Sequence, residues 1–258
     1  MTHILTTIDG GVGTITIDRR ERFNSLDVET ARDLRRAGLQ MARDRGVRAV
    51  VLRGSDGIFC SGADLKEIRQ HPPYGNGFKE ILEYIHSTIS EVRRAPKPFI
   101  AAVDGVAAAG GFGIAMCCDI VIASERATFE WAYGKTGLTG AESSTFMLPR
   151  LLGLRRALDL VFLNPRLDAR RAYELGLVSI VTSSFEDEVT AVAKQLASGP
   201  TEAFGIAKEL INSAAGMDRL DVHLDRELEQ LARIADGDNF AEGIDAFFGK
   251  RAPEFDHA

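Results

Sequence analysis

The chain has 258 residues, of which 45% are hydrophobic and 26% charged, and its formal net charge is −6. These proportions are ordinary for a globular protein, and the acidic balance argues against nucleic acid as a main partner, because a phosphate-binding surface is usually strongly basic. No apolar run approaches the roughly 18 residues that a membrane span needs, and the first residues lack the pattern of an export signal. The three cysteines show no zinc-binding spacing, which favours a reduced, cytoplasmic compartment.

The first half of the chain predicts strands and helices in alternation. Two β-branched runs around Asp9-Gly10-Gly11 predict a hairpin. Asp27 stands where it can cap a helix whose apolar residues recur at helical spacing as far as Met41. The pattern then predicts buried strands over 47–54, 99–105 and 118–124, and a helix over 77–94. Strands and helices repeated in this order indicate parallel strands joined by crossover connections.

From about residue 185 onward, the pattern is helical only. We therefore expect an α/β core over residues 1–195 and a helical oligomerisation region over residues 196–258. Some apolar stripes in this region look too extensive for one small core and predict contacts between subunits. The clearest stripe consists of Leu220, Leu224, Leu228 and Leu231.

A glycine-rich turn, "AGGFG" over residues 109–113, lies between an apolar strand and an apolar helix. It does not match a phosphate-binding P-loop, because no Lys-Ser or Lys-Thr pair follows. It does not match the dinucleotide fingerprint either, since Met116 stands where the third glycine belongs. Tight packing of the helix on the strand is one explanation for the turn, and close approach of a ligand is the other.

A second stretch, "FCSGADLKEI", also places small residues at a strand-to-helix junction. The first N–H groups of a helix have no partner within it, so two such junctions can direct two N–H groups at one point. Two converging donors form an oxyanion hole, in which one donor contributes roughly 3–4 kcal/mol to transition-state stabilisation. The two loops therefore predict that the carbonyl oxygen of a ligand lies against this backbone.

These two loops, together with "LGLRRALDLVFLNPRLDARRAYELGLV", resemble the crotonase (enoyl-CoA hydratase/isomerase) superfamily. The resemblance runs in order from "ITIDRRERFNSL" to "EGIDAFFGKRAPEF". It implies an α/β fold, a crotonase-like spiral of ββα units with a C-terminal helical trimerisation region. It also implies an acyl-CoA thioester substrate, no metal and no prosthetic group, with coenzyme A entering only as part of the substrate. The assembly that it implies is a homotrimer or a hexamer made of two trimers.

The resemblance also implies roles for individual residues. The backbone N–H groups of Ala63 and Gly110 would be the oxyanion donors. Coenzyme A carries phosphates and an adenine, so basic and aromatic residues should line its channel. The positions that match are Arg22, Lys66, Phe247 and Lys250, the last two reaching the adenine from the same or an adjacent subunit. Each of these charges also has a simpler explanation as a solvated surface residue.

Hydratases of this family use two glutamates to activate water and donate its proton. Counting along the resemblance puts Gly113 and Tyr133 at these two positions, so both carboxylates are missing. The related isomerases carry a single acid in segments similar to "GL-x-P-[DE]-G-G". In "GLTGAESST" that position holds Ala141, and Glu142 follows directly. A carboxylate near an apolar acyl pocket has a raised pKa, which suits it to move a proton between carbons.

Each of these residues also has a structural explanation. Glu142 would be favoured by the dipole at the start of the next helix. Tyr133 would pack with Trp131 in a half-buried strand. His71 and Tyr74 lie in a segment that often lines the acyl pocket in this family, although a histidine before two prolines is more typical of a surface.

The preferred function is an acyl-CoA enzyme that forms a thioester enolate and moves a double bond or transfers a related proton. Glu142 is the predicted base, and Tyr133 is the second candidate for the proton transfer. Hydration, ring hydrolysis and decarboxylation remain as alternatives of the same enzyme class. An acyl-CoA-binding protein without catalytic activity is an alternative of a different class.

Overall fold

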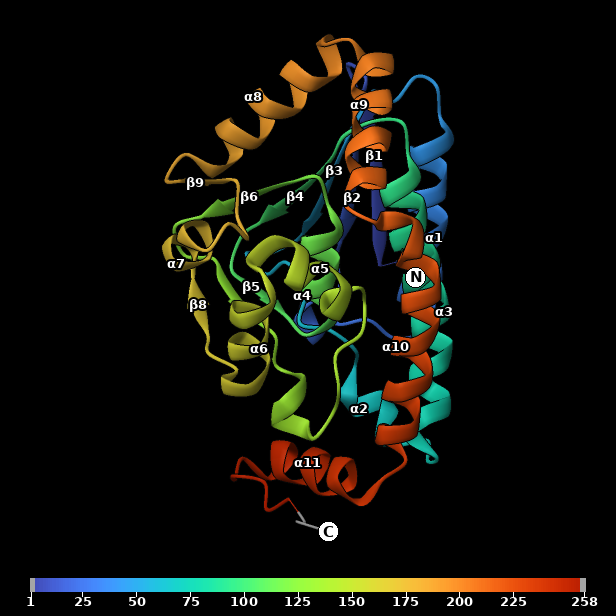
Figure 1. Ribbon diagram of the computed structural model, residues 1–258, viewed down its shortest axis with the longest axis vertical. Coiled ribbons are helices and arrows are strands. Elements are labelled where there is room, and N and C mark those ends of the chain that lie inside the picture. Colours follow the sequence, from blue (N-terminus) through green and yellow to red (C-terminus); the bar gives the residue numbers. More distant parts are fainter. Residues whose placement is uncertain (1–2, 256–258) are drawn as a thin grey trace.

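The computed structural model describes residues 3–255. Its main sheet has six strands in the order β1-β2-β3-β4-β6-β9 (Figure 1). The predicted N-terminal hairpin is confirmed as the antiparallel pair β1–β2, and every later pair in this sheet is parallel. The strands are β1 (Ile4–Asp9), β2 (Val12–Ile17), β3 (Ala49–Gly54), β4 (Phe99–Val103), β6 (Ile120–Ser124) and β9 (Ile180–Thr182).

A second, smaller sheet has the order β5-β7-β8, with β5 (Val106–Ala108), β7 (Thr128–Glu130) and β8 (Leu167–Asp168). From β4 onward the chain crosses between the two sheets, since β4, β6 and β9 belong to the main sheet and β5, β7 and β8 to the smaller one. The strands β4 and β5 precede α4 (Gly110–Cys117), and β6 and β7 precede α5 (Ser144–Leu152). The strand predicted over 99–105 is confirmed as β4, which ends at Val103. A separate strand at Val106–Ala108, in the smaller sheet, was not predicted.

Long helices cover one side of the main sheet. Asp27 caps α1 (Val28–Arg43) as predicted, and its side chain accepts a hydrogen bond from Thr30 N at 2.7 Å. The helices α1 and α10 (Leu220–Ala235) both pack against α3 (Tyr74–Arg94) (Figure 1). The leucine stripe on α10 is therefore not a free subunit surface. Its leucines pack within this chain, where Leu220, Leu224 and Leu231 are buried and Leu228 is partly buried.

The remaining helices are α2 (Leu65–Ile68), α6 (Leu154–Leu163), α7 (Ala169–Glu174), α8 (Phe185–Ser198), α9 (Thr201–Ala214) and α11 (Asp238–Gly249). Two of them, α8 and α11, lie at opposite ends of the molecule (Figure 1). The expected boundary near residue 195 lies within α8, whose residues Phe185, Val189 and Ala193 pack on β3, β4 and β6. At the opposite end, α11 lies against the segment Tyr133–Thr136 (Figure 1). Within residues 3–255, no helix has the length and apolar character to cross a membrane.

Candidate active site

The two glycine-containing loops meet in space. Gly62 has a φ of +93°, which side-chain-bearing residues rarely adopt, and a Cβ at this position would lie 2.9 Å from the Ala109 Cβ and 3.1 Å from the Gly110 nitrogen. The loop before α2 also pairs with β5, since Ala108 N donates to Cys60 O at 3.0 Å. The sequence prediction that these loops converge is confirmed, and glycine at position 62 is what permits the close approach.

The two predicted donor amides face this meeting point. Among residues 3–255, neither Ala63 N nor Gly110 N has a hydrogen-bond acceptor. Gly110 is the first residue of α4, so its N–H group lies at the positive end of a helix. Ala109, just before it, has a φ of 47°, a conformation that a non-glycine residue holds only where its surroundings impose it. The arrangement is thus able to bind an oxyanion.

A buried ion-pair network fixes the loop that carries the Ala63 amide. The Asp64 carboxylate accepts hydrogen bonds from the backbone of Lys66 and Glu67 at 3.0 and 3.2 Å, and so caps α2. Arg19 then contacts Asp64 at 2.8 Å and Asp27 at 2.6 Å. Because all three side chains are largely buried, the network ties the loop to the start of α1.

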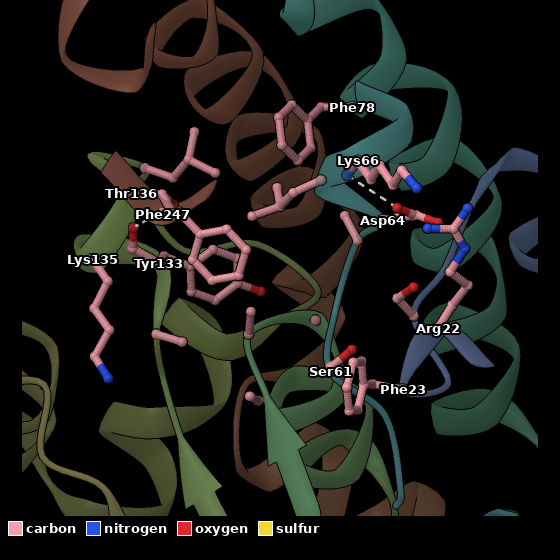
Figure 2. A pocket seen from close by; sticks show the side chains of 18 of the residues that line it. Arg22, Phe23, Ser61, Asp64, Lys66, Phe78, Tyr133, Lys135, Thr136 and Phe247 are labelled. Atoms are coloured by element: carbon pink, nitrogen blue, oxygen red, sulfur yellow. Dashed lines mark hydrogen bonds between the residues drawn. The ribbon is translucent and has the colours of Figure 1, made fainter. Parts of the chain in front are cut away.

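A cavity of about 470 Å³ opens beside the two amides. Ala63 and Gly110 form part of its wall, and Phe78, Leu138 and Leu231 give it an apolar lining. Figure 2 shows Phe78 on one side of the space and Ser61 on the opposite side. A cavity of this size and character accommodates an apolar acyl group.

The carboxylate of Glu142 lies next to the Gly110 amide. Its side chain lines the cavity, and a Cβ on Gly110 would lie only 2.7 Å from Glu142 Oε1. Glu142 is 3% exposed, and burial raises its pKa to about 7. A base whose pKa lies near neutral pH is well matched to proton transfer.

Tyr133 completes this part of the site. Its hydroxyl donates a hydrogen bond to Glu142 Oε2 and lies 3.3 Å from Ala141 O. The predicted packing on Trp131 is confirmed, with the ring centroids 5.0 Å apart. The predicted half-buried strand is wrong, because β7 ends at Glu130 and Tyr133 begins a short 3₁₀ helix. This turn directs the hydroxyl into the cavity (Figure 2).

The backbone of Glu142 occupies the space beside Gly113. A Cβ on Gly113 would lie 2.3 Å from Glu142 O and 2.9 Å from Glu142 Cβ. Any side chain at position 113 would therefore collide with the turn that carries Glu142. The glycine at this position is a consequence of where that turn lies.

Basic and aromatic residues stand at the mouth of the cavity. Arg22 and Lys66 lie on one side and Phe247 on the other, where its ring is near Tyr133 (Figure 2). Phe247 belongs to α11 of the same chain, so this wall needs no second subunit. Lys250, by contrast, is not among the residues that line the cavity.

Comparison with known proteins identifies the family to which the chain belongs. The family model described as "Enoyl-CoA hydratase/isomerase" matches residues 7–258. The chain belongs to the enoyl-CoA hydratase/isomerase family. Members of this family are enzymes that act on acyl-CoA thioesters.

The crystal structure of an enoyl-CoA hydratase from Mycobacterium avium subsp. paratuberculosis K-10 matches with a TM-score of 0.90 and 33% sequence identity, covering 99% of each chain. The predicted crotonase-like fold is thus confirmed.

Relatives in the enoyl-CoA hydratase/isomerase family differ in the reaction that their names give. The chain is 35% identical over 259 residues to 1,2-epoxyphenylacetyl-CoA isomerase of Escherichia coli K12, covering 99% of this chain and 98% of the relative. It is 32% identical over 252 residues to 4-chlorobenzoyl coenzyme A dehalogenase-2 of an Arthrobacter species, covering 96% and 91%. Similarity within the enoyl-CoA hydratase/isomerase family therefore leaves the reaction open, and the arrangement of acids must decide it.

Two residues singled out from the sequence lie outside the cavity, and two residues that contact the site were not predicted. His71 is exposed, and Tyr74 packs against Phe240 outside the cavity lining. His86 and Glu227 were missed, although both contact the turn of Glu142. They come from helices distant in sequence, so no local motif pointed to them. In residues 3–255, no group of three or more His, Cys, Asp or Glu side chains is arranged to hold a metal ion.

Proposed function

We propose that this enzyme transfers a proton between carbon atoms of an acyl-CoA thioester, most simply by moving a double bond from the 3-position to the 2-position. The observation that carries this proposal is the buried Glu142 carboxyl group beside the Gly110 amide. The glycine at position 113 removes one acid of the water-adding pair. A single carboxyl group beside an oxyanion hole suits removal and return of one proton better than addition of water.

After the substrate binds, the reaction has two proton-transfer steps. The thioester oxygen first binds between the amides of Ala63 and Gly110. The Glu142 carboxylate then removes a proton from Cα, and the C–H electron pair forms the enolate C=C bond while the thioester oxygen takes the negative charge. Protonated Glu142 finally returns the proton to Cγ, where the Cβ=Cγ electron pair forms the new C–H bond. The enolate C=C pair moves to lie between Cα and Cβ, and the oxyanion re-forms the thioester C=O bond. Tyr133 donates to the Glu142 carboxylate and stabilises its ionised form.

The rest of the cavity supports a coenzyme A thioester as the substrate. Arg22 and Lys66 would contact its phosphates, and Phe247 would contact its adenine. The apolar part of the lining would receive the acyl group. The relatives named 1,2-epoxyphenylacetyl-CoA isomerase and 4-chlorobenzoyl coenzyme A dehalogenase support the inclusion of ring-bearing acyl groups among the substrates to be tested.

The first experiment is a substrate panel in deuterated water, followed by mass spectrometry. It compares 3-hexenoyl-CoA, a ring-bearing thioester, a malonyl-type thioester and crotonyl-CoA. We expect 3-hexenoyl-CoA to isomerise and to take up deuterium, and crotonyl-CoA to be hydrated slowly or not at all. Fast hydration of crotonyl-CoA contradicts the proposal. If thioesters bind but none is turned over or takes up deuterium, the chain is instead an acyl-CoA-binding protein without catalytic activity.

Variants of the site then test the base. Glu142→Gln should lower turnover roughly 10²–10⁴-fold while the affinity for acyl-CoA is kept. Tyr133→Phe should lower turnover less, because the Glu142 carboxylate remains. An unchanged turnover in Glu142→Gln would exclude this residue as the base.

A further inference from the structure

Glu227 is a buried carboxylate that takes no direct part in the proposed reaction. It belongs to α10, yet it contacts the start of α5, 84 residues earlier in the chain. Its Oε2 accepts a hydrogen bond from Ser143 N at 2.8 Å. Its Oε1 accepts hydrogen bonds from Thr145 N at 3.0 Å and from Thr145 Oγ1 at 2.5 Å. The side chain is 3% exposed, so these contacts are shielded from water.

The start of α5 depends on this external acceptor. The first N–H groups of a helix find no acceptor within the helix. Ser143, which precedes α5, makes no capping hydrogen bond with its side chain, and in residues 3–255 its hydroxyl oxygen has no hydrogen-bond partner. A carboxylate at the positive end of a helix is favourable. Glu227 thus caps α5 from a separate helix.

The same turn has an unusual backbone. Glu142 and Ser143 are consecutive and have φ values of 49° and 63°, in the left-handed region that non-glycine residues seldom occupy. Such residues persist where contacts from outside hold them, and they concentrate at functional sites. On the α3 side, His86 Nε2 accepts the N–H of Glu142 at 3.3 Å. Contacts from α3 and α10 therefore hold the turn on both sides.

We propose that Glu227 is a positioning residue for Glu142. It holds residues 142–145 in the one conformation that keeps the Glu142 carboxylate beside the Gly110 amide. The inference rests on the proposed function, in which Glu142 is the base. It also gives the C-terminal helical region a direct role in the site, because α10 supplies the residue that orients the base.

The charge of Glu227 adds a second, measurable effect. Burial is the main cause of the raised pKa of Glu142, and the negative charge of Glu227 raises it further. Burial raises the pKa of Glu227 itself to about 7, so the two carboxyl groups titrate as a pair. Other ionisable groups lie near this pair. Cys60, Tyr133, His86 and His223 are close to it, and the charges of Arg150 and Arg226 act on His223. Burial raises the pKa of Cys60 and Tyr133 and lowers that of both histidines, so these four groups are mostly uncharged at neutral pH.

The test is Glu227→Gln, measured by isomerisation of 3-hexenoyl-CoA to the 2-enoyl thioester over a range of pH. We expect kcat for isomerisation to fall roughly 10–100-fold, because a displaced base loses its alignment with the substrate. KM should remain unchanged, and the acid limb of the kcat profile should move to lower pH, because a neighbouring negative charge is lost. Glu229→Gln is the matched control, since it removes the same charge from an exposed position on α10 and should change neither kcat nor the pH profile.

Three results overturn the inference. If Glu142→Gln is inactive while Glu227→Gln keeps the wild-type kcat and pH profile, the positioning role is wrong and the proposed function stands. If Glu142→Gln is fully active, the proposed function fails, and the positioning role fails with it. Should Glu227→Gln not fold, Thr145→Val tests the same contact with Thr145→Ser as its control. We expect Thr145→Val to lower kcat several-fold and Thr145→Ser to restore it, and equal kcat values in both overturn the inference.

Discussion

Burial of Glu142 suits its carboxylate to proton transfer but lowers the free energy of unfolding at neutral pH. Its carboxyl group has a normal pKa of 4.5 in the unfolded chain and a pKa of about 7 in the folded protein, because burial disfavours its charge. Between these values the folded state binds more protons than the unfolded state. The free energy of unfolding therefore falls as the pH rises from about 5 to about 7, and the loss persists at higher pH.

Two measurements follow from this titration. The wild-type kcat should rise with pH through about 7, as Glu142 becomes the ionised base. Glu142→Gln should be more stable than the wild type at pH 8 by about 1–3 kcal/mol, because it buries no charge, and the difference should shrink toward pH 5. Chemical denaturation of both proteins at the two pH values measures the effect. Equal stabilities at pH 8 would contradict the assigned titration.

Among single residues, the sequence predicts best those that act through their backbone N–H groups. Small residues at two helix starts predict converging donor amides, and the resemblance to the family assigns them to Ala63 and Gly110. Glu142 was one position away from the acid expected from the resemblance, and only the left-handed turn shows why its side chain still reaches the site. His86 and Glu227 were not predictable, since their roles depend on how α3 and α10 pack.

At the scale of elements, Arg19 joins the loop before α2 to the start of α1. Arg19→Met should lower the free energy of unfolding by about 3–5 kcal/mol, because it leaves the carboxylates of Asp27 and Asp64 buried without their partner. It should also lower turnover, since the Ala63 amide loses its support. Arg20→Met is the control, because Arg20 pairs with Asp18 at the surface. Similar destabilisation in both variants would refute the role of the network.

Elements were predictable where the pattern is periodic or capped, as for the hairpin, α1 and the C-terminal helices. The strand β5 was not, because only Val106–Ala108 lie between the Asp104-Gly105 pair and the glycine-rich turn. A run of three residues is too short to show the period of a strand.

For the whole molecule, exposed apolar side chains lie away from the leucine stripe that the sequence suggested as a subunit contact. On α6, Leu154, Phe162 and Leu163 are 69%, 76% and 77% exposed, while Leu220, Leu224 and Leu231 on α10 are buried. Apolar side chains gathered in this way mark protein–protein contacts. We propose that α6 forms part of the interface of a homotrimer.

Light scattering at micromolar concentration should give the mass of three chains or a multiple of it. Phe162→Asp should shift this mass toward that of one chain, because it places a charge in the proposed interface. Leu5→Asp is the control, since Leu5 is exposed on β1, at the sheet edge opposite β9. A wild-type protein that remains a monomer would contradict the predicted assembly.

The collision between position 113 and the Glu142 turn bears on how reactions change during evolution. A carboxylate side chain at position 113 and the observed turn of residues 141–143 compete for one volume, since a Cβ on Gly113 would lie 2.3 Å from Glu142 O. A lineage cannot pass between the two arrangements by adding one acid and later discarding the other. The turn and the glycine must change together, or the intermediate must tolerate a site with no acid at either position. Mutations at these two places are therefore expected to be strongly epistatic, with each harmful alone and acceptable only in the presence of the other.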